Sequence, residues 1–187
     1  MQKALMLTIL LTGFLIVAGP GHSFGENLIR NGGFEQAASD GSPTGWQINK
    51  DRGNKVDMSL QDTEKHSGKY AYKISIAPPG GRVTLSPTKD AIKAPEPGRP
   101  YKLSFWIKSR NLDYNQFFAA PAARVNFRPS RVKPAPTIDL MANMEDGQRW
   151  QELTMTVKAP DDAQQLHLSV ILTKGTVWLD DFSVTPQ

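Results

Sequence analysis

The sequence contains no cysteine and only three histidines among its 187 residues. Without cysteine, the chain has neither a disulfide framework nor an attachment point for a lipoprotein anchor. It also lacks a Gly-x-Ser-x-Gly elbow, and its histidines are scattered along the chain. We therefore expect a protein that is not an enzyme. His167 alternates outward from two leucines, which is typical of a surface residue rather than a catalytic base.

Strong net charge is also missing. The chain has 22 Lys+Arg against 18 Asp+Glu, a formal net charge of +4. This excess is too small to indicate nucleic-acid binding, and no basic helix or RNA-binding motif is present. It only favours anionic partners over cationic ones. We therefore expect no nucleic acid among the partners.

Long apolar runs are absent after the first residues. Lys3 is followed by a continuous apolar run, Ala4–Val17, and then by the helix-breaking segment Ala18–Gly25. This arrangement predicts a signal peptide over residues 1–25, cleaved after Gly25. The run is short for a membrane span, although an uncleaved anchor is the alternative. We expect a secreted or periplasmic protein with no membrane attachment after cleavage. Without disulfides, its fold must depend on core size or a bound ion.

Residues 26–187 have the size of a single domain. Short runs of alternating apolar and polar residues are separated by turn clusters, which predicts an all-β protein. The clearest runs are Tyr70–Ala77, Tyr101–Lys108, Leu153–Val157 and Leu166–Leu172. No stretch holds a convincing helical period. Many short strands with regular turn signals predict a β-sandwich.

The last predicted strand, Thr176–Val184, carries two adjacent acids. Read with a period of two, Asp180 shares a face with Trp178 and Phe182, and Asp181 lies on the other face. A carboxylate against the apolar side needs a cation or several hydrogen-bond donors. We expect Asp180 to be that carboxylate, with its partner in the segment Asn27–Glu35. The alternative is that both acids end an exposed strand.

Five segments, in this order, resemble the signatures of carbohydrate-binding modules of families 4, 9 and 22. They are Asn27–Glu35 with Pro43–Trp46, His66–Ile74, Tyr101–Lys108, Gln148–Leu153 and Val177–Phe182. The resemblance covers nearly all of residues 26–187. It implies a galactose-binding-domain-like jelly roll, a β-sandwich of two antiparallel sheets.

The resemblance also implies a structural calcium where the first strand meets the last. Carried over by position, Glu35 and Asp180 would be side-chain ligands, with Asp181 as the alternative. Backbone carbonyls near Gly33 and in the loop 65–68 would complete a shell of oxygens, which suits a hard cation. The alternative is that Glu35 pairs with a lysine or arginine and no ion is bound.

In modules of this kind, sugar lies across the concave sheet and stacks on aromatic rings. Trp106 stands on the non-core face of its strand, as do Arg124, Asn126 and Arg128 on theirs. If the two strands share a sheet, these four residues form a glycan site. The arginines would suit an acidic glycan. The alternative is that a loop containing Tyr114, Phe117 and Phe118 covers Trp106 and that the arginines are solvated or paired.

The function we predict is that of an exported, non-catalytic, carbohydrate-binding-module-like protein. Its partner would be a polysaccharide or glycan, and the arginines would suit an acidic one. The alternative is a structural or adaptor β-sandwich of the cell envelope that binds protein rather than sugar. Trp46 is predicted to fill one end of the sandwich, Trp150 to belong to the core, and Trp178 to do either.

Overall fold

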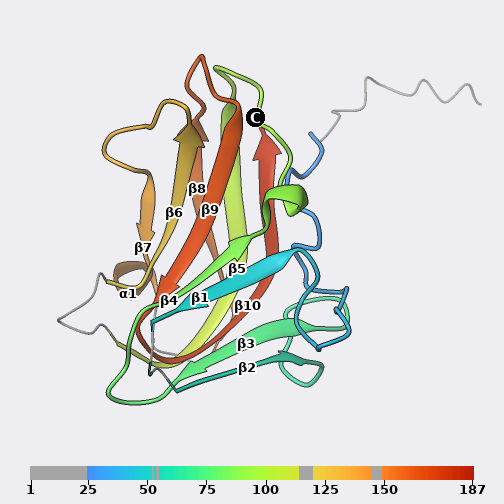
Figure 1. Ribbon diagram of the computed structural model, residues 1–187, viewed down its shortest axis with the longest axis vertical. Coiled ribbons are helices and arrows are strands. Elements are labelled where there is room, and N and C mark those ends of the chain that lie inside the picture. Colours follow the sequence, from blue (N-terminus) through green and yellow to red (C-terminus); the bar gives the residue numbers. More distant parts are fainter. Residues whose placement is uncertain (1–24, 52, 54, 114–119, 145–148) are drawn as a thin grey trace, which may run out of the picture.

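The computed structural model describes residues 25–51, 53, 55–113, 120–144 and 149–187. Within them, two antiparallel five-stranded sheets pack face to face as a jelly-roll sandwich (Figure 1). The first, called the β9 sheet, has the order β1 (Trp46–Lys50), β4 (Val83–Pro87), β9 (Gln165–Leu172), β6 (Ala122–Arg128) and β7 (Thr137–Asp139). The second, called the β10 sheet, has the order β2 (Val56–Gln61), β3 (Ala71–Ile76), β10 (Lys174–Pro186), β5 (Pro100–Asp113) and β8 (Gln151–Lys158). The short helices η1 (Lys89–Ala91) and α1 (Leu140–Asn143) lie in connections. The predicted all-β jelly roll is confirmed.

The core lies between the two sheets and follows the alternation read from the sequence. In β5, Leu103, Phe105 and Ile107 are buried. In β6, Val125 and Phe127 are buried. The residues between them face outward and are half-buried or exposed. Period-two patterning therefore assigns nearly every strand residue to its face, because one side of each sheet packs on the other sheet.

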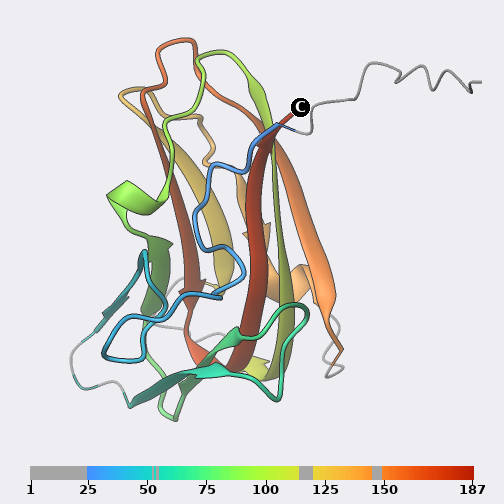
Figure 2. The same cartoon turned by 90° about the vertical axis from the view of Figure 1, so that its right-hand side faces the viewer.

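The N-terminal segment runs beside β10, as Figure 2 shows. The amide of Leu28 donates to the carbonyl of Val184 at 2.9 Å, and the side chain of Asn27 accepts from the amide of Val184 at 2.9 Å. Further along, the amide of Phe182 donates to the carbonyl of Gly32 at 3.0 Å. The predicted meeting of this segment with the last strand is therefore observed.

A β-bulge in β10 changes the faces that we read for the last strand. Asp180 lies opposite Trp106 of β5, and Ser183 lies opposite Ser104, so β10 has one residue more than β5 between these pairs. Asp181 takes a left-handed conformation with φ of 50°. Phe182 consequently faces the core with Leu179, whereas Trp178 and Asp180 face away from it. The prediction that Trp178, Asp180 and Phe182 share one face is wrong, because simple alternation cannot anticipate an inserted residue.

The predicted tryptophan roles differ in outcome. Trp46 is buried and packs on Phe34 and Phe182, with ring centroids 4.9 Å and 5.0 Å away. Trp178 is also buried, but on the outer side of the β10 sheet, under Lys108 and Arg110. Trp150 is only half-buried.

Several predictions fall on residues outside the described ranges. They are the leader up to residue 24 and the aromatic loop with Tyr114, Phe117 and Phe118. In the part of the chain that the structure describes, no helix is long and apolar enough to span a membrane.

Candidate functional site

The four residues predicted to bind glycan do not form one surface. Trp106 lies on β5, in the β10 sheet, whereas Arg124, Asn126 and Arg128 lie on β6, in the β9 sheet. All four face outward, so the two groups are on opposite faces of the sandwich. The expectation that the two strands share a sheet is wrong. Side-chain alternation reports which face is apolar, but it does not report which sheet a strand joins.

On the outer face of the β9 sheet, the three predicted β6 residues meet three residues of β9. The antiparallel register pairs Arg124 with Ser169, Asn126 with His167, and Arg128 with Gln165. We call these six residues the polar row. Residues directly opposite each other on neighbouring antiparallel strands have adjacent side chains. Within the described residues, no side chain of the polar row makes a hydrogen bond or an ion pair, so their polar groups are available to a ligand.

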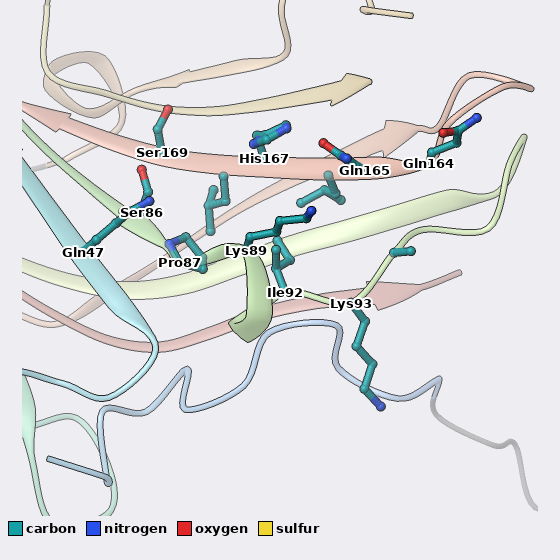
Figure 3. Close-up of a pocket in the computed structure, with 13 residues that line it drawn as sticks. Gln47, Ser86, Pro87, Lys89, Ile92, Lys93, Gln164, Gln165, His167 and Ser169 are labelled. Carbon is teal, nitrogen blue, oxygen red and sulfur yellow. The ribbon is translucent and has the colours of Figure 1, made fainter. Parts of the chain in front are cut away.

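A cavity of about 430 Å³ adjoins the polar row on its β9 side (Figure 3). One wall is the continuous run Gln164–Ser169, and the other comes from Ser86, Pro87, Lys89 and the segment Ile92–Ala94. Gln47 of β1 lies at one end and Gln164 at the other (Figure 3). The volume is in the range of small-molecule sites, roughly 300–1,000 Å³. The polar row and the cavity together form the candidate site.

The charge around the site is positive. None of the residues lining the cavity is acidic, whereas Lys89 and Lys93 are among them, Lys93 being paired with Glu26. Arg124 and Arg128 add two guanidinium groups from β6. Partial burial, together with Arg128 and Arg131, lowers the pKa of His167 below its ordinary value. The polar row and the cavity therefore lie in a positive electrostatic environment.

Phe, Tyr and Trp are absent from this outer face among the described strand residues. The outward positions of the two central strands that line the cavity are Thr84, Ser86, Gln165, His167, Ser169 and Ile171. A flat indole or phenol on which a sugar ring could stack is thus missing from this part of the chain. Recognition here depends on hydrogen bonds, charge and the aliphatic lining of the cavity.

On the opposite face, Trp106 is partly covered. The imidazole of His66 stacks on its indole with centroids 3.6 Å apart and an interplanar angle of 11°. The same imidazole lies 2.7 Å from Asp181 Oδ2 and contacts Trp150 edge-on at 5.9 Å. The predicted cover by Tyr114, Phe117 and Phe118 lies outside the described residues, and within them the ring is covered by His66 of the loop 62–70. Trp106 anchors this loop instead of standing open to solvent.

Three carboxylates from the two ends of the domain meet at the same loop. Asp180 is fully buried, and its Oδ2 accepts from the amides of His66 and Ser67 at 3.0 Å and 3.2 Å. Glu35 accepts from the amide of Lys69 at 2.9 Å. Burial raises the pKa of Asp180 to about 6, and the neighbouring Asp181 adds to this effect. Asp180 thus has several hydrogen-bond donors, as expected for a buried carboxylate. The prediction that its partner lies in Asn27–Glu35 is wrong, because the donors are amides of the loop 62–70 and of Asp181.

The predicted calcium ligands surround Gly33. A Cβ atom at Gly33 would lie 3.3 Å from Asp181 Oδ1, 3.8 Å from Asp180 Oδ1 and 3.8 Å from the Cγ of Glu35. Two of these atoms are carboxylate oxygens, which calcium prefers as ligands, whereas the carboxylate of Glu35 accepts from the amide of Lys69. In the described part of the chain, however, no three acidic or histidine side chains converge as a metal-binding group. Two carboxylates and backbone carbonyls would therefore have to hold the ion.

Sequence reasoning missed part of the site. The sequence predicts only a surface position for His167. It does not indicate that Gln165 and Ser169 line a cavity beside it. Part of the signal is present in the sequence, because Gln165, His167 and Ser169 alternate with buried apolar residues and so share the outer face of one strand. Their position beside β6 follows from the strand order, which the sequence does not display.

These observations define a β-sandwich domain with a polar, positively charged outer face and an adjoining cavity on one sheet. The chain belongs to the Carbohydrate binding domain family CBM_4_9, whose model matches residues 26–176. A sequence comparison with curated proteins finds no match.

Solved structures with a similar fold include carbohydrate-binding modules and enzymes. The enzymatically active domain of tailspike protein 4 from bacteriophage CBA120 has a TM-score of 0.62 and 14% identity, covering 86% of this chain and 21% of that chain. This chain therefore spans about a fifth of that tailspike domain. TmCBM61 in complex with β-1,4-galactotriose has a TM-score of 0.58 and 15% identity, covering 87% of this chain and 99% of that one. The Stig cyclase Fisc from Fischerella sp. TAU has a TM-score of 0.60 and 18% identity, with coverages of 88% and 98%. At these identities, the likeness shows the fold.

Proposed function

We propose that this protein binds a glycan on the outer face of the β9 sheet, across the polar row and into the adjoining cavity. The observation that carries the proposal is the register of β6 and β9, which places six unpartnered polar side chains beside a cavity of about 430 Å³. Guanidinium, amide and hydroxyl groups match the hydroxyl-rich surface of a sugar. Membership of the carbohydrate-binding family and the galactotriose bound by TmCBM61 support the same ligand class.

The glycan that fits best carries negative charge. Arg124 and Arg128 make no ion pair within the described residues, and no acid lines the cavity. A guanidinium can hold a carboxylate or a sulfate through two parallel hydrogen bonds. We therefore propose a preference for acidic over neutral polysaccharides, which added salt should weaken.

The test is binding of the purified protein to a panel of neutral and acidic polysaccharides, followed by Arg124→Ala. Loss of a charge-assisted hydrogen bond worth about 1.5–3 kcal/mol should lower the affinity by roughly ten- to a hundredfold. Arg149→Ala is the matched control, because Arg149 is exposed just before β8 of the other sheet. Binding to no polysaccharide would overturn the proposal and favour the protein-binding alternative. Equal losses in the two variants would indicate a general charge effect.

We also propose that the protein acts outside the cytoplasm and without catalysis. The support for export is the apolar run Ala4–Val17 followed by Ala18–Gly25. The support for a binding role is the family match. N-terminal sequencing of protein from the native host should begin at residue 26. A mature chain that still begins with Met1 would contradict cleavage and indicate a membrane-anchored form.

A structural calcium at Glu35 and Asp180 is the third part of the proposal. It is supported by the convergence of carboxylates on Gly33 and by the burial of Asp180 with no lysine or arginine paired to it among the described residues. A bound cation would offset the desolvation of that carboxylate.

A further inference from the structure

The cavity exists because β4 separates from β9. The two strands pair only from Val83 to Leu85, opposite Val170 to Leu172. The next residues, Ser86 and Ser169, both line the cavity. Among the described strands, none is paired with Gln165–Ser169 on the side of β4, and residues of the connection that contains η1 line the cavity opposite this edge (Figure 3). The polar face of the sheet is therefore interrupted by an opening that reaches toward the core.

The opening has a polar rim and an aliphatic floor. Gln165 and His167 are exposed at the rim. Leu166 and Leu168 line the inner end of the same cavity and belong to the buried core, with 2% of each residue exposed. Ile92 and Pro87 add aliphatic surface from the opposite wall. A ligand that enters between His167 and Lys89 leaves a polar surface and reaches an apolar one.

An unsubstituted sugar does not match a cavity with a polar rim and an aliphatic floor. Its C–H groups form flat faces, which are complementary to an aromatic plane, and its hydroxyls project around the edge of the ring. A hydroxyl directed at Leu166 and Leu168 would lose its water without gaining a hydrogen bond. A small apolar group that projects from the ring would instead bury its surface on the aliphatic floor. The floor is continuous with the polar row, so one ligand can contact both.

We infer that the cavity takes an apolar substituent of the bound glycan, an O-acyl or O-methyl group, while the sugar ring lies on the polar row. This inference rests on the proposed function, because it assumes a glycan at the same site. The protein would then select substituted over unsubstituted forms of one polysaccharide. Burial of one acetyl methyl should raise the affinity by about four- to tenfold.

The test uses two acidic polysaccharides, acetylated polygalacturonate and acetylated alginate, each compared with the same preparation after mild alkaline deacetylation. Deacetylation should lower the affinity by about four- to tenfold for at least one of the two polymers. Light O-methylation of the deacetylated polymer distinguishes recognition of apolar surface from recognition of the ester group. Recovery with methyl groups indicates that apolar surface is read, whereas recovery only with acetyl groups indicates an ester-specific site. Equal binding before and after deacetylation of both polymers would overturn the inference.

A cavity-filling variant separates this inference from the proposed function. Ala94 is exposed and lines the cavity, so Ala94→Trp should abolish the preference for the acetylated form and retain binding of the deacetylated form. Thr154→Trp, which adds the same ring to an exposed position of β8, should leave the preference unchanged. An acetyl preference that survives Ala94→Trp would also overturn the inference. If neither the acetylated nor the deacetylated form binds, and no member of the polysaccharide panel binds, the result would count against the proposed function instead.

Discussion

Gly32 lies where the N-terminal segment crosses β10, and the absence of a side chain there lets the two backbones approach. A Cβ atom on Gly32 would lie 2.0 Å from the carbonyl oxygen of Phe182. Phe34, two residues later, takes a left-handed conformation with φ of 58° and is fully buried. At the residue scale, this crossing holds the two ends of the domain together and brings Glu35 to the last strand.

Gly32→Ala should therefore lower the free energy of unfolding by about 3 kcal/mol, because backbone must move to remove the clash. Urea denaturation measures the loss. Gly41→Ala is the matched control, since Gly41 has φ of +79° and no atom within 4 Å of its added Cβ. It should cost about 1 kcal/mol, from the left-handed conformation alone. Equal losses would mean that the segment adjusts at Gly32 without strain.

If the glycan binds at the polar row as proposed, His167 should make its binding dependent on pH. Its pKa is lowered in the folded protein, so the folded state takes up a proton less readily than the unfolded state. This group's contribution to stability is present above the unfolded pKa, about 6.5, and is lost as the pH falls through the folded value. An anionic glycan beside the imidazole would raise the pKa again, so its affinity should increase between pH 7.5 and pH 5.5. Isothermal titration at the two pH values measures the change, and His167→Gln should remove it. Affinity that falls with decreasing pH would contradict an acidic ligand at this position.

At the scale of elements, the loop 62–70 and strand β5 are joined on the outer face of the β10 sheet. His66 stacks on Trp106, and Glu64 lies 2.6 Å from the ammonium group of Lys108. The loop backbone is held in turn by Asp180. This junction gives Trp106 a structural role on the face opposite the polar row.

Trp106→Ala should thus lower stability and leave glycan affinity unchanged. Removing a half-buried ring and its stacking partner should cost about 2–3 kcal/mol. A melting curve and a binding isotherm of the same preparation measure both effects. Lys102→Ala, on the outer face of the same strand, should change neither by much, because its pairing with Glu152 is exposed. A loss of affinity at unchanged stability would instead indicate that the glycan binds on the outer face of the β10 sheet, at Trp106.

At the scale of the whole molecule, the sandwich closes through contacts between its two ends. The segment 27–35, the loop 62–70 and the end of β10 meet around three carboxylates. If calcium is bound there, it stabilises the folded state by mass action, because the unfolded chain has no such site. At roughly a hundred times its Kd, the ion would contribute about 2.7 kcal/mol, or about 5–10 °C in Tm.

Excess chelator should consequently lower Tm by this amount, and added calcium should restore it. Metal analysis of the purified protein measures the stoichiometry. Glu35→Gln should melt near the chelated protein and respond weakly to calcium. A Tm that is indifferent to chelator, in protein that contains no metal, would show that the amides of His66, Ser67 and Lys69 satisfy these carboxylates without an ion.

The sequence alone determined the class of fold and the face of most strand residues, because alternation of apolar and polar side chains follows directly from burial on one side. It also placed Asn27–Glu35 beside the last strand, although the hydrogen-bond donors to Asp180 are the amides of His66, Ser67 and Asp181 rather than groups of that segment. Tertiary structure decided the rest. An extra residue at Asp181 moved Trp178 to the outer face, and the strand order put Trp106 and Arg124 on opposite sheets. Strand order and bulges arise from long-range pairing, which leaves no periodic mark on the local sequence. The cavity beside His167 depends on the divergence of β4 and β9, so only the tertiary structure reveals it.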